Sequence, residues 1–268
     1  MSPSTKTRIG VAGYGFIGRH LCQMIRDHAE WGLELAFVWN RDPGKLSGLP
    51  DELVLADLGQ VADRSADLVV ECAHPDVTAR YGETILRVAD YLPLSVNAFA
   101  DAQLESDLTA VAKASGRRIF IPHGALIGLD NLVEVRDMWK EVTITFRKNP
   151  ANIDFADSGM DPAAITGETV LYDGPARGIS RLFPRNVNTM TTCALATVGL
   201  DRCRAVLVAD PALDVAIAEV EAHGKDGSLH QSRKVQPVVG VSGTEMLAAQ
   251  VGSVLRAAKV FTPGLNYV

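Results

Sequence analysis

Short apolar runs alternate with helical patterns from the start of the chain to about Ile121. Ile17, Leu21 and Ile25 recur at the spacing of one helix face directly after the first apolar run. The alternation predicts a doubly wound parallel sheet, an α/β fold with helices on both faces. The expected strands are Ile9–Ala12, Leu33–Trp39, Leu53–Leu55, Ala66–Glu71, Leu92–Val96 and Arg118–Ile121, and the expected helices follow Gly15, run over Asp76–Tyr91 and start at Asp101.

The pattern changes in the second half of the chain. Residues 142–146 alternate apolar and polar side chains, which is typical of a half-exposed antiparallel strand. Further strands are expected at Thr169–Tyr172, Arg204–Val208, Val215–Ala222 and Leu229–Val235, and helices at Thr189–Val198 and Thr244–Val260. We therefore predict a first domain over residues 1–125 and an α+β domain over 126–243. The helix at 244–260 is expected to pack back on the first domain.

The segment between the first strand and the first helix has the pattern G-x-G-x-x-G. Gly13 permits a tight turn, Gly15 lets a pyrophosphate approach the backbone, and Gly18 lets the helix pack on its strand. The following helix opens with Phe16 and Ile17, whose N–H groups and partial positive charge favour phosphates. The pattern predicts a dinucleotide site at these residues. The alternative is a glycine turn with a purely structural role.

The residues after the second strand bear on the choice of dinucleotide. In folds that prefer NAD, an Asp or Glu about 20 residues past the glycines binds the ribose 2′-hydroxyl. Asn40 and Arg41 occupy that place here, and an amide and a guanidinium accept a 2′-phosphate that a carboxylate would repel. We therefore favour NADP over NAD. In the alternative, Arg41 is a solvated turn residue and Asp42 reaches the ribose.

Two further segments follow strand ends, where the ligand crevice of such a sheet lies. Ala73 and His74 come after the strand that ends at Glu71, so we expect them near the cofactor; His74 as a hydrogen-bonded loop residue is the alternative. His123 opens a glycine-rich segment that leads into the second domain. Clefts between domains are common substrate sites.

Composition narrows the class of protein. The chain has 268 residues, 47% hydrophobic and 22% charged, which is ordinary for a globular protein. A net charge of −6 and the lack of a basic stripe argue against nucleic-acid binding. The four cysteines form no C-x-x-C pair, so neither a zinc site nor a disulfide framework is indicated. The segment MSPSTKTR has no apolar core and nothing resembles a membrane span, so we expect a cytoplasmic protein.

Several motifs together resemble the L-aspartate dehydrogenase family, in particular its animal-type aspartate dehydrogenase domain-containing branch. They are GYGFIG (13–18), VWNRDPG (38–44), HGALIGLD (123–130), FPRNVN (183–188) and VADP (208–211), and they span nearly the whole chain. The resemblance implies NAD(P)-dependent oxidation of aspartate to iminoaspartate, which water converts to oxaloacetate and ammonia. It also implies a Rossmann domain, an α+β domain with substrate and dimer contacts, a homodimer, and cofactor contacts at Ala125 and Asn188.

One departure from the family pattern concerns the catalytic base. The bacterial and archaeal members have a histidine in a pattern like A-D-P-x-x-x-x-N-x-H, whereas this chain has Ala216 and Ala218 at the Asn and His places. His123 is our candidate for the substitute base, with His223 or His230 as further alternatives. A chain without any histidine base would be a catalytically impaired NADP(H)-binding sensor. A dehydrogenase of another amino or imino acid is also open.

A dicarboxylic substrate also requires fixed cations. Lys148, Arg177 and Arg185 are the candidates near the family motifs, and a guanidinium binds a carboxylate through two parallel hydrogen bonds. We select Lys148 and Arg185 as substrate-binding residues. The alternative for each is a solvated or interface charge.

Overall fold

The computed structural model describes residues 6–124, 126–184, 187–239, 242–243 and 246–261. The chain forms two compact units. The first contains the residues up to Ala98, Ala102–Pro122 and the chain from Leu247 onward, and the second contains Phe99–Asp101 and His123–Met246. Ala125 and Arg185, which the sequence analysis proposed for the site, lie outside the described residues. None of the helices in the described ranges is long and apolar enough to cross a membrane.

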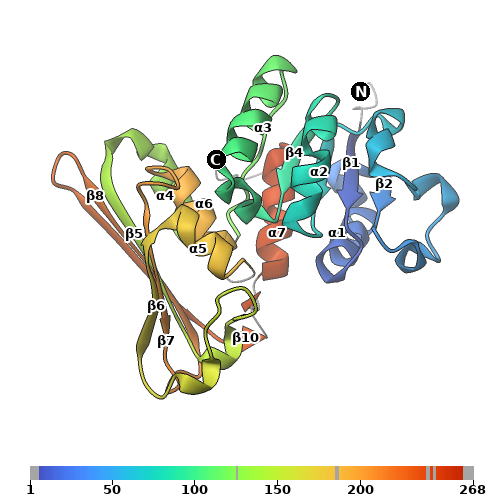
Figure 1. Cartoon of the computed structure of the whole chain (residues 1–268). Helices are drawn as coiled ribbons and strands as arrows, with labels where there is room; N and C mark the ends of the chain where they lie inside the picture. The colour runs from blue at the N-terminus through green and yellow to red at the C-terminus, as the bar shows by residue number, and fades with distance from the viewer. Residues whose placement is uncertain (1–5, 125, 185–186, 240–241, 244–245, 262–268) are drawn as a thin grey trace. The chain divides into compact units, whose positions relative to one another are not determined.

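The first unit is built on a four-stranded parallel sheet with the order β2-β1-β3-β4 (Figure 1). Parallel neighbours require crossover connections, and helices supply two of them: α1 links β1 to β2 and α2 links β3 to β4. The strands are β1 (Thr7–Ala12), β2 (Leu33–Trp39), β3 (Leu68–Glu71) and β4 (Asp90–Pro93), and the helices are α1 (Phe16–Asp27), α2 (Pro75–Leu86), α3 (Ala102–Ala114) and α7 (Met246–Ala257).

Helices cover both faces of this sheet. Leu21 of α1 and Val254 of α7 belong to one buried cluster with Val11 of β1, so α1 and α7 share a face. The other face belongs to α2, where Thr78 hydrogen-bonds to Tyr91 of β4 at 2.9 Å between the hydroxyl oxygens. The predicted doubly wound parallel sheet is therefore confirmed. The terminal helix completes the core of a sheet formed at the opposite end of the sequence.

Two of the predicted strands are wrong. The segment Leu53–Leu55 follows a 3-10 turn at Asp51–Leu53 and pairs only through Val54, which bridges to Val38. The segment Arg118–Ile121 pairs only through Ile119, which bridges to Tyr91. A single bridge is not a ladder, and β3 and β4 are no longer than the run at 118–121, so the length of an apolar run does not decide whether it pairs. Apolar runs of this length do not by themselves distinguish a strand from a buried loop.

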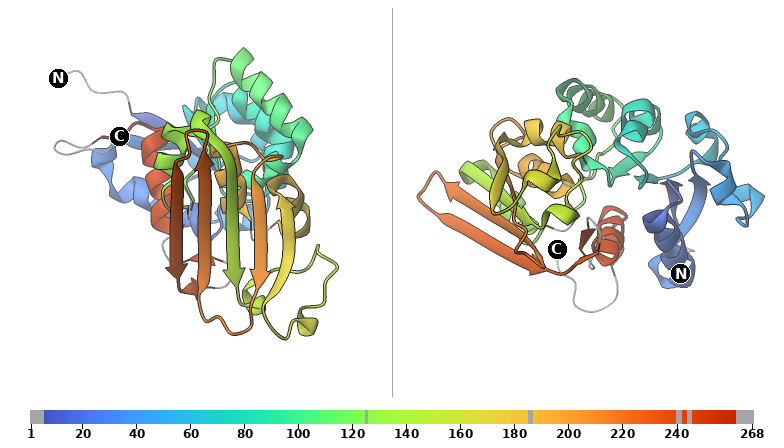
Figure 2. Two further views of the ribbon diagram at one scale, coloured as in Figure 1. Left: turned by 90° about the vertical axis from the view of Figure 1, so that its left-hand side faces the viewer. Right: turned by 60° about the horizontal axis from the view of Figure 1, so that its bottom comes forward.

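The second unit is a five-stranded sheet with the order β6-β7-β5-β8-β9, covered by helices on one face and open on the other (Figure 2). Its main elements are α4 (Leu129–Glu134), β5 (Trp139–Lys148), β6 (Thr169–Pro175), α5 (Ala176–Leu182), α6 (Asn188–Ala196), β7 (Arg204–Ala209), β8 (Ala216–Gly224) and β9 (Leu229–Gln236). A two-stranded ribbon of β10 (Val238–Val239) and β11 (Ser242–Gly243) follows.

The prediction for the first strand of this sheet is half right. β5 pairs antiparallel with β8, as expected, but parallel with β7 on its other side. Alternation of apolar and polar residues shows which face of a strand is buried, not the direction of its partners. The short helices α4 and α5 were not predicted. The helix expected at Asp76–Tyr91 ends earlier, since α2 stops at Leu86 and β4 starts at Asp90.

Candidate functional site

The glycine-rich turn of the first unit has the geometry that its sequence predicts. Gly13 has φ +118°, and a Cβ atom there would lie 2.8 Å from the backbone of Cys72. A Cβ atom on Gly18 would lie 1.9 Å from the carbonyl oxygen of Gly13. Both positions therefore exclude any side chain. Gly15 differs, because a Cβ atom there meets nothing within 4 Å, so the space above it is open.

The start of α1 is prepared for an anion. Gly15 is the N-cap and provides no side-chain hydrogen bond, and the first turn contains no acidic residue. Phe16 is exposed at the helix start, and Ile17 is half-buried beside it. Uncapped N–H groups and the helix dipole together favour a phosphate group here. The turn and the helix start therefore fit a pyrophosphate.

Of the three residues after β2, Asn40 and Asp42 hold the local backbone, and Arg41 is exposed. Asn40 holds the glycine turn, because its Oδ1 accepts from the N–H of Tyr14 at 3.3 Å while its Nδ2 donates to the carbonyl of Asp42. The carboxylate of Asp42 accepts from the N–H of Gly44 at 3.0 Å and so caps the next turn. Arg41 is exposed, and its guanidinium forms no hydrogen bond or ion pair with the residues that the structure describes. It is thus available to a ligand.

A buried carboxylate joins two loops at the same edge of the sheet. Glu71 ends β3 and is fully buried. It accepts hydrogen bonds from the N–H of Ala73 at 2.6 Å and from the N–H and hydroxyl of Ser95, both at 3.0 Å. Burial raises the pKa of Glu71 to about 6, although these hydrogen bonds oppose the shift. Sequence analysis missed Glu71; a carboxylate that closes an apolar strand is the signal that could have revealed it.

His74 is the N-cap of α2, and its hydrogen bond there agrees with the alternative of a hydrogen-bonded residue. Its Nδ1 accepts from the N–H of Asp76 at 3.3 Å, and the Asp76 carboxylate lies 3.2 Å from the same atom. The ring is half-exposed at the carboxyl end of β3, the edge of the sheet at which the glycine turn also lies. Its place agrees with the sequence expectation, and its contact with a cofactor stays a prediction.

In the second unit, the glycine-rich segment lies beside the start of α6. A Cβ atom on Gly124 would be 3.9 Å from the hydroxyl of Thr189, the residue after Asn188. Asn188 itself begins α6. His123 precedes this turn, and its Nε2 lies 3.3 Å from Oδ1 of Asp130, with about a quarter of the ring side chain exposed. The fold thus brings His123 and Asn188 into the same region of the unit.

Lys148 is the most unusual cation in the second unit. It ends β5 and is only 7% exposed. Its ammonium lies 5.3 Å from the centre of the Phe146 ring and forms no hydrogen bond or ion pair with any residue in the described ranges. Burial lowers the pKa of Lys148 to about 8. A buried cation without a counter-ion is costly and is typical of a functional site.

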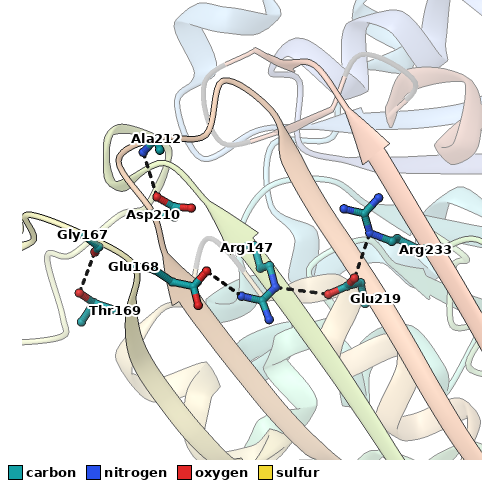
Figure 3. Close-up of polar contacts among 8 residues, drawn as sticks. All are labelled: Arg147, Gly167, Glu168, Thr169, Asp210, Ala212, Glu219 and Arg233. Atoms are coloured by element: carbon teal, nitrogen blue, oxygen red, sulfur yellow. Dashed lines mark hydrogen bonds and ion pairs between the residues drawn. The ribbon is translucent and has the colours of Figure 1, made fainter.

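The backbone around Lys148 is held firmly. Its carbonyl accepts from the N–H of Asp210 at 2.9 Å, and the next residue, Asn149, donates to the carbonyls of Pro211 and Leu213, both at 3.0 Å. The carboxylate of Asp210 in turn accepts from the N–H of Ala212 at 2.9 Å (Figure 3). These bonds tie the end of β5 to the connection between β7 and β8, which begins with the last two residues of the VADP motif.

The acidic residues of this sheet lie on the opposite, open face. There Arg147 contacts Glu168 at 3.3 Å and Glu219 at 3.4 Å (Figure 3). Glu219 also accepts from Arg233 at 3.0 Å. Since successive residues of a strand face opposite ways, Lys148 and Arg147 project to different faces. The charged side chains of the open face pair with one another, whereas Lys148 has no counter-ion among the described residues.

The two alanines that replace the family's Asn and His lie on β8. Ala218 pairs with Phe146 of β5, and Ala216 pairs with Gln236 of β9. The alternative histidines are elsewhere. His223 pairs with Glu221 on the open face, and His230 packs near Trp139, opposite Ala222. The strand between Ala216 and Ala222 is about 20 Å long, so His230 lies far from Lys148.

Arg177 has a structural role. Its guanidinium forms a bidentate pair with Asp201 at 2.6 and 2.8 Å. It also donates to the carbonyls of Phe99 and Ala100, both at 3.2 Å, and so ties this segment to the second unit. The guanidinium holds the pKa of Asp201 below its usual range. These contacts already occupy the donors that a substrate carboxylate would require.

Comparison with known proteins gives a separate family match for each half of the chain. Residues 13–122 match the family model described as homoserine dehydrogenase, NAD binding domain, and residues 130–259 match aspartate dehydrogenase, C-terminal. An aspartate dehydrogenase domain-containing protein of Xenopus tropicalis is 40% identical over 88% of this chain and 85% of its own length. An L-aspartate dehydrogenase of Methanococcoides burtonii is 32% identical over 90% and 93%.

Solved structures agree with this assignment. The crystal structure of aspartate dehydrogenase from Thermotoga maritima superposes with a TM-score of 0.74 at 28% identity, covering 98% of this chain and 99% of that one. A homoserine dehydrogenase from Thiobacillus denitrificans, with a TM-score of 0.59 at 13% identity, shares the fold. Both halves of the sequence match dehydrogenase family models, and the glycine turn before α1 fits a dinucleotide. The chain therefore belongs to the aspartate dehydrogenase family of NAD(P)-dependent oxidoreductases.

Proposed function

We propose that this protein catalyses the NAD(P)-dependent oxidative deamination of L-aspartate, or the reverse amination. Lys148 carries the proposal: it is a largely buried cation with no counter-ion among the described residues, in the unit that matches the aspartate dehydrogenase model. An anionic substrate would supply that counter-ion. The relatives named L-aspartate dehydrogenase support this choice of substrate.

The proposed site assigns a role to each part of the chain. The pyrophosphate binds at Gly13, Gly15 and Gly18 and at the start of α1, where the backbone is open and positive. We propose Asn40, Arg41, Ala73 and His74 as nucleotide contacts of the first unit, and the resemblance to the family adds Ala125 and Asn188 as cofactor contacts. The bound nicotinamide supplies the hydride acceptor. Lys148 and Arg185 bind substrate carboxylates.

His123 is the proposed base. The α-ammonium of aspartate gives a proton to the His123 imidazole, the hydride leaves Cα, and the nitrogen lone pair forms the C=N bond of iminoaspartate. Water then adds to that carbon, and cleavage of the C–N bond releases ammonia and oxaloacetate. The Asp130 carboxylate beside His123 supports this role, because it orients the ring and stabilises the imidazolium ion that forms.

The test is direct. The purified protein is incubated with L-aspartate and either NADP or NAD, and the reduced cofactor is followed by its absorbance. We expect turnover with aspartate, and we expect His123→Ala to lower kcat by about 10²–10⁴-fold while NADPH binding is retained. Tight NADPH binding without turnover on any dicarboxylic amino acid would instead support the sensor hypothesis, which Ala218 motivates.

We further propose that NADP is preferred over NAD. The exposed guanidinium of Arg41 supports this preference, as does the use of the Asp42 carboxylate in capping a turn. Arg41→Ala is expected to weaken NADPH binding about tenfold and to leave NADH binding nearly unchanged, since only NADPH carries the 2′-phosphate. Equal losses for both nucleotides, measured by fluorescence titration, would contradict the preference.

A homodimer and a cytoplasmic location stay predictions. The open face of the second sheet supports self-association, because it exposes Val170, Leu229 and Val235 beside its ion pairs. Light scattering on a sizing column tests the dimer, which predicts twice the chain's mass of 28.7 kDa. Fractionation of the source cells tests the location.

A further inference from the structure

The connection between β3 and α2 packs directly against the glycine turn of the first unit. The N–H of Cys72 donates to the carbonyl of Ala12 at 2.9 Å, so the ends of β1 and β3 are held side by side. A Cβ atom on Gly13 would lie 2.8 Å from the backbone of Cys72 and 2.9 Å from the Cβ atom of Ala73. The close approach of these two residues is therefore one reason that Gly13 carries no side chain.

The thiol of Cys72 lies between two glycines of the motif. Its Sγ atom donates to the carbonyl oxygen of Gly13 at 3.2 Å. A Cβ atom on Gly18 would lie 3.1 Å from the same sulfur. The thiol thus contacts the turn on one side and the first turns of α1 on the other. A larger group at this position would push the two apart, because a packed interior does not accept added volume without strain.

The peptide groups that lead into α1 are held by both neighbouring strands. On the β2 side, the N–H of Gly13 donates to the carbonyl of Trp39 at 2.7 Å, and the N–H of Tyr14 donates to Oδ1 of Asn40 at 3.3 Å. On the β3 side, the carbonyl of Gly13 accepts from the Cys72 thiol. Because each peptide group is planar, these contacts fix the direction of the backbone that enters the helix start. A backbone fixed in advance loses less entropy when it binds a ligand.

The surroundings of Cys72 keep its thiol protonated. Desolvation raises the pKa of Cys72 well above its ordinary value, and the neighbouring Glu71 carboxylate raises it further. A protonated thiol donates a hydrogen bond, whereas a thiolate would repel both the Gly13 carbonyl and a phosphate group. The hydrogen bond from the N–H of Ala73 to Glu71 fixes the backbone on both sides of Cys72. The side chain is therefore suited to holding the turn rather than to covalent chemistry.

We propose that Cys72 is a positioning residue for the pyrophosphate of the cofactor. Its thiol holds the Gly13 carbonyl and so keeps the N–H groups after Gly15 directed at the phosphates. It acts through the backbone of the turn and needs no contact of its own with the cofactor. This inference rests on the proposed placement of the pyrophosphate at this turn, and it is independent of the choice of amino-acid substrate.

Two substitutions separate the hydrogen bond from the packing. Cys72→Ala removes the donor, whereas Cys72→Ser replaces the thiol with a hydroxyl donor. Binding of NADPH and of NADH is measured by fluorescence titration. We expect Cys72→Ala to raise both dissociation constants about fivefold, because one modest hydrogen bond is lost, and Cys72→Ser to stay within twofold of wild type. The losses for NADPH and NADH should be equal, unlike those in Arg41→Ala, since both nucleotides carry the pyrophosphate.

Cys22→Ala is the matched control, since Cys22 is a buried cysteine of α1 in the core of the same unit. It should lower stability in urea unfolding and leave both dissociation constants unchanged. Nucleotide affinity within twofold of wild type in Cys72→Ala, or equal losses in Cys72→Ala and Cys72→Ser, overturns the role of Cys72 alone. The expected pattern without aspartate turnover would preserve that role and defeat the proposed function. A wild-type protein that binds neither nucleotide would overturn both.

Discussion

Two buried ionisable side chains, Glu71 and Lys148, bear on function, and they differ in how their charges are compensated. Glu71 has its charge compensated by N–H and hydroxyl donors from two loops. Lys148 has no such compensation among the described residues, and its pKa is lowered to about 8. A compensated charge stabilises local structure, whereas an uncompensated one indicates a ligand.

At Glu71, we predict a loss of nucleotide affinity without loss of fold. In Glu71→Gln, one of the N–H groups of Ala73 and Ser95 faces an amide NH₂ instead of an acceptor, so the two loops shift. The dissociation constant for NADPH is expected to rise about tenfold, which corresponds to about 1.4 kcal/mol. Fluorescence titration measures it.

The pH dependence of this effect gives a second check. Since the pKa of Glu71 is about 6, wild-type affinity for NADPH should fall as the pH drops through 6 and the carboxylate protonates. Glu71→Gln should lack this step. Glu34→Gln is the control, because Glu34 is a partly exposed carboxylate on β2. A wild-type affinity that is flat between pH 5 and 7.5 would exclude this role.

At Lys148, we predict that Lys148→Met stabilises the protein. The native pKa of about 8 lies below the unfolded value of 10.5, so the native state is penalised for binding this proton. The penalty is fully present below pH 8 and disappears as the pH rises to 10.5 and above. The free energy of unfolding of Lys148→Met should exceed that of wild type by up to about 3 kcal/mol at pH 7.

Urea unfolding followed by tryptophan fluorescence measures this difference. The gain should shrink steadily between pH 8 and pH 10.5. A destabilised variant at pH 7 would show that Lys148 has a structural partner, and the proposed substrate role of Lys148 would lose its main support.

At the scale of elements, the start of α1 separates stability from function. Gly15 has φ −86° and ψ −153°, a conformation that any residue adopts, and a side chain there meets open space. In Gly15→Asp, the carboxylate caps the helix but repels a pyrophosphate. We expect an unchanged or higher melting temperature and NADPH affinity reduced at least 30-fold.

Gly15→Ser distinguishes charge from size at this position. Its hydroxyl also caps the helix, but it carries no charge, so the loss of affinity should be clearly smaller than for Gly15→Asp. Equal losses in the two variants would point to a steric effect, and the assignment of the pyrophosphate to this helix start would then be weakened.

At the scale of the whole molecule, the helix α7 near the end of the sequence belongs to the same unit as the first strand, β1. Val254 of α7 is 1% exposed and packs in the cluster that contains β1 and α1. Val254→Ala should lower the free energy of unfolding by about 2 kcal/mol, through lost burial and the cavity that remains. Thermal unfolding in the presence and absence of NADPH measures this loss. Arg256→Ala, an exposed change on the same helix, should cost little.

The sequence by itself determined the local features. Apolar periodicity located most strands and helices of both units, and the spacing of Gly13, Gly15 and Gly18 predicted a glycine turn suited to a nucleotide, because these signals depend on neighbours within a few residues. The same periodicity failed at Leu53–Leu55 and Arg118–Ile121, where a strand requires a partner that a short run does not specify.

Only the tertiary structure decided which distant residues share a face. It placed Gln236 and Lys234 beside the alanines of β8, turned Arg177 into a structural link with Asp201, and showed that Glu71 joins two loops. Strand register and burial arise from pairing between segments far apart in the chain. Register sets which side chains meet and burial sets the cost of their charges, so the surroundings of Lys148 could not be predicted from the sequence.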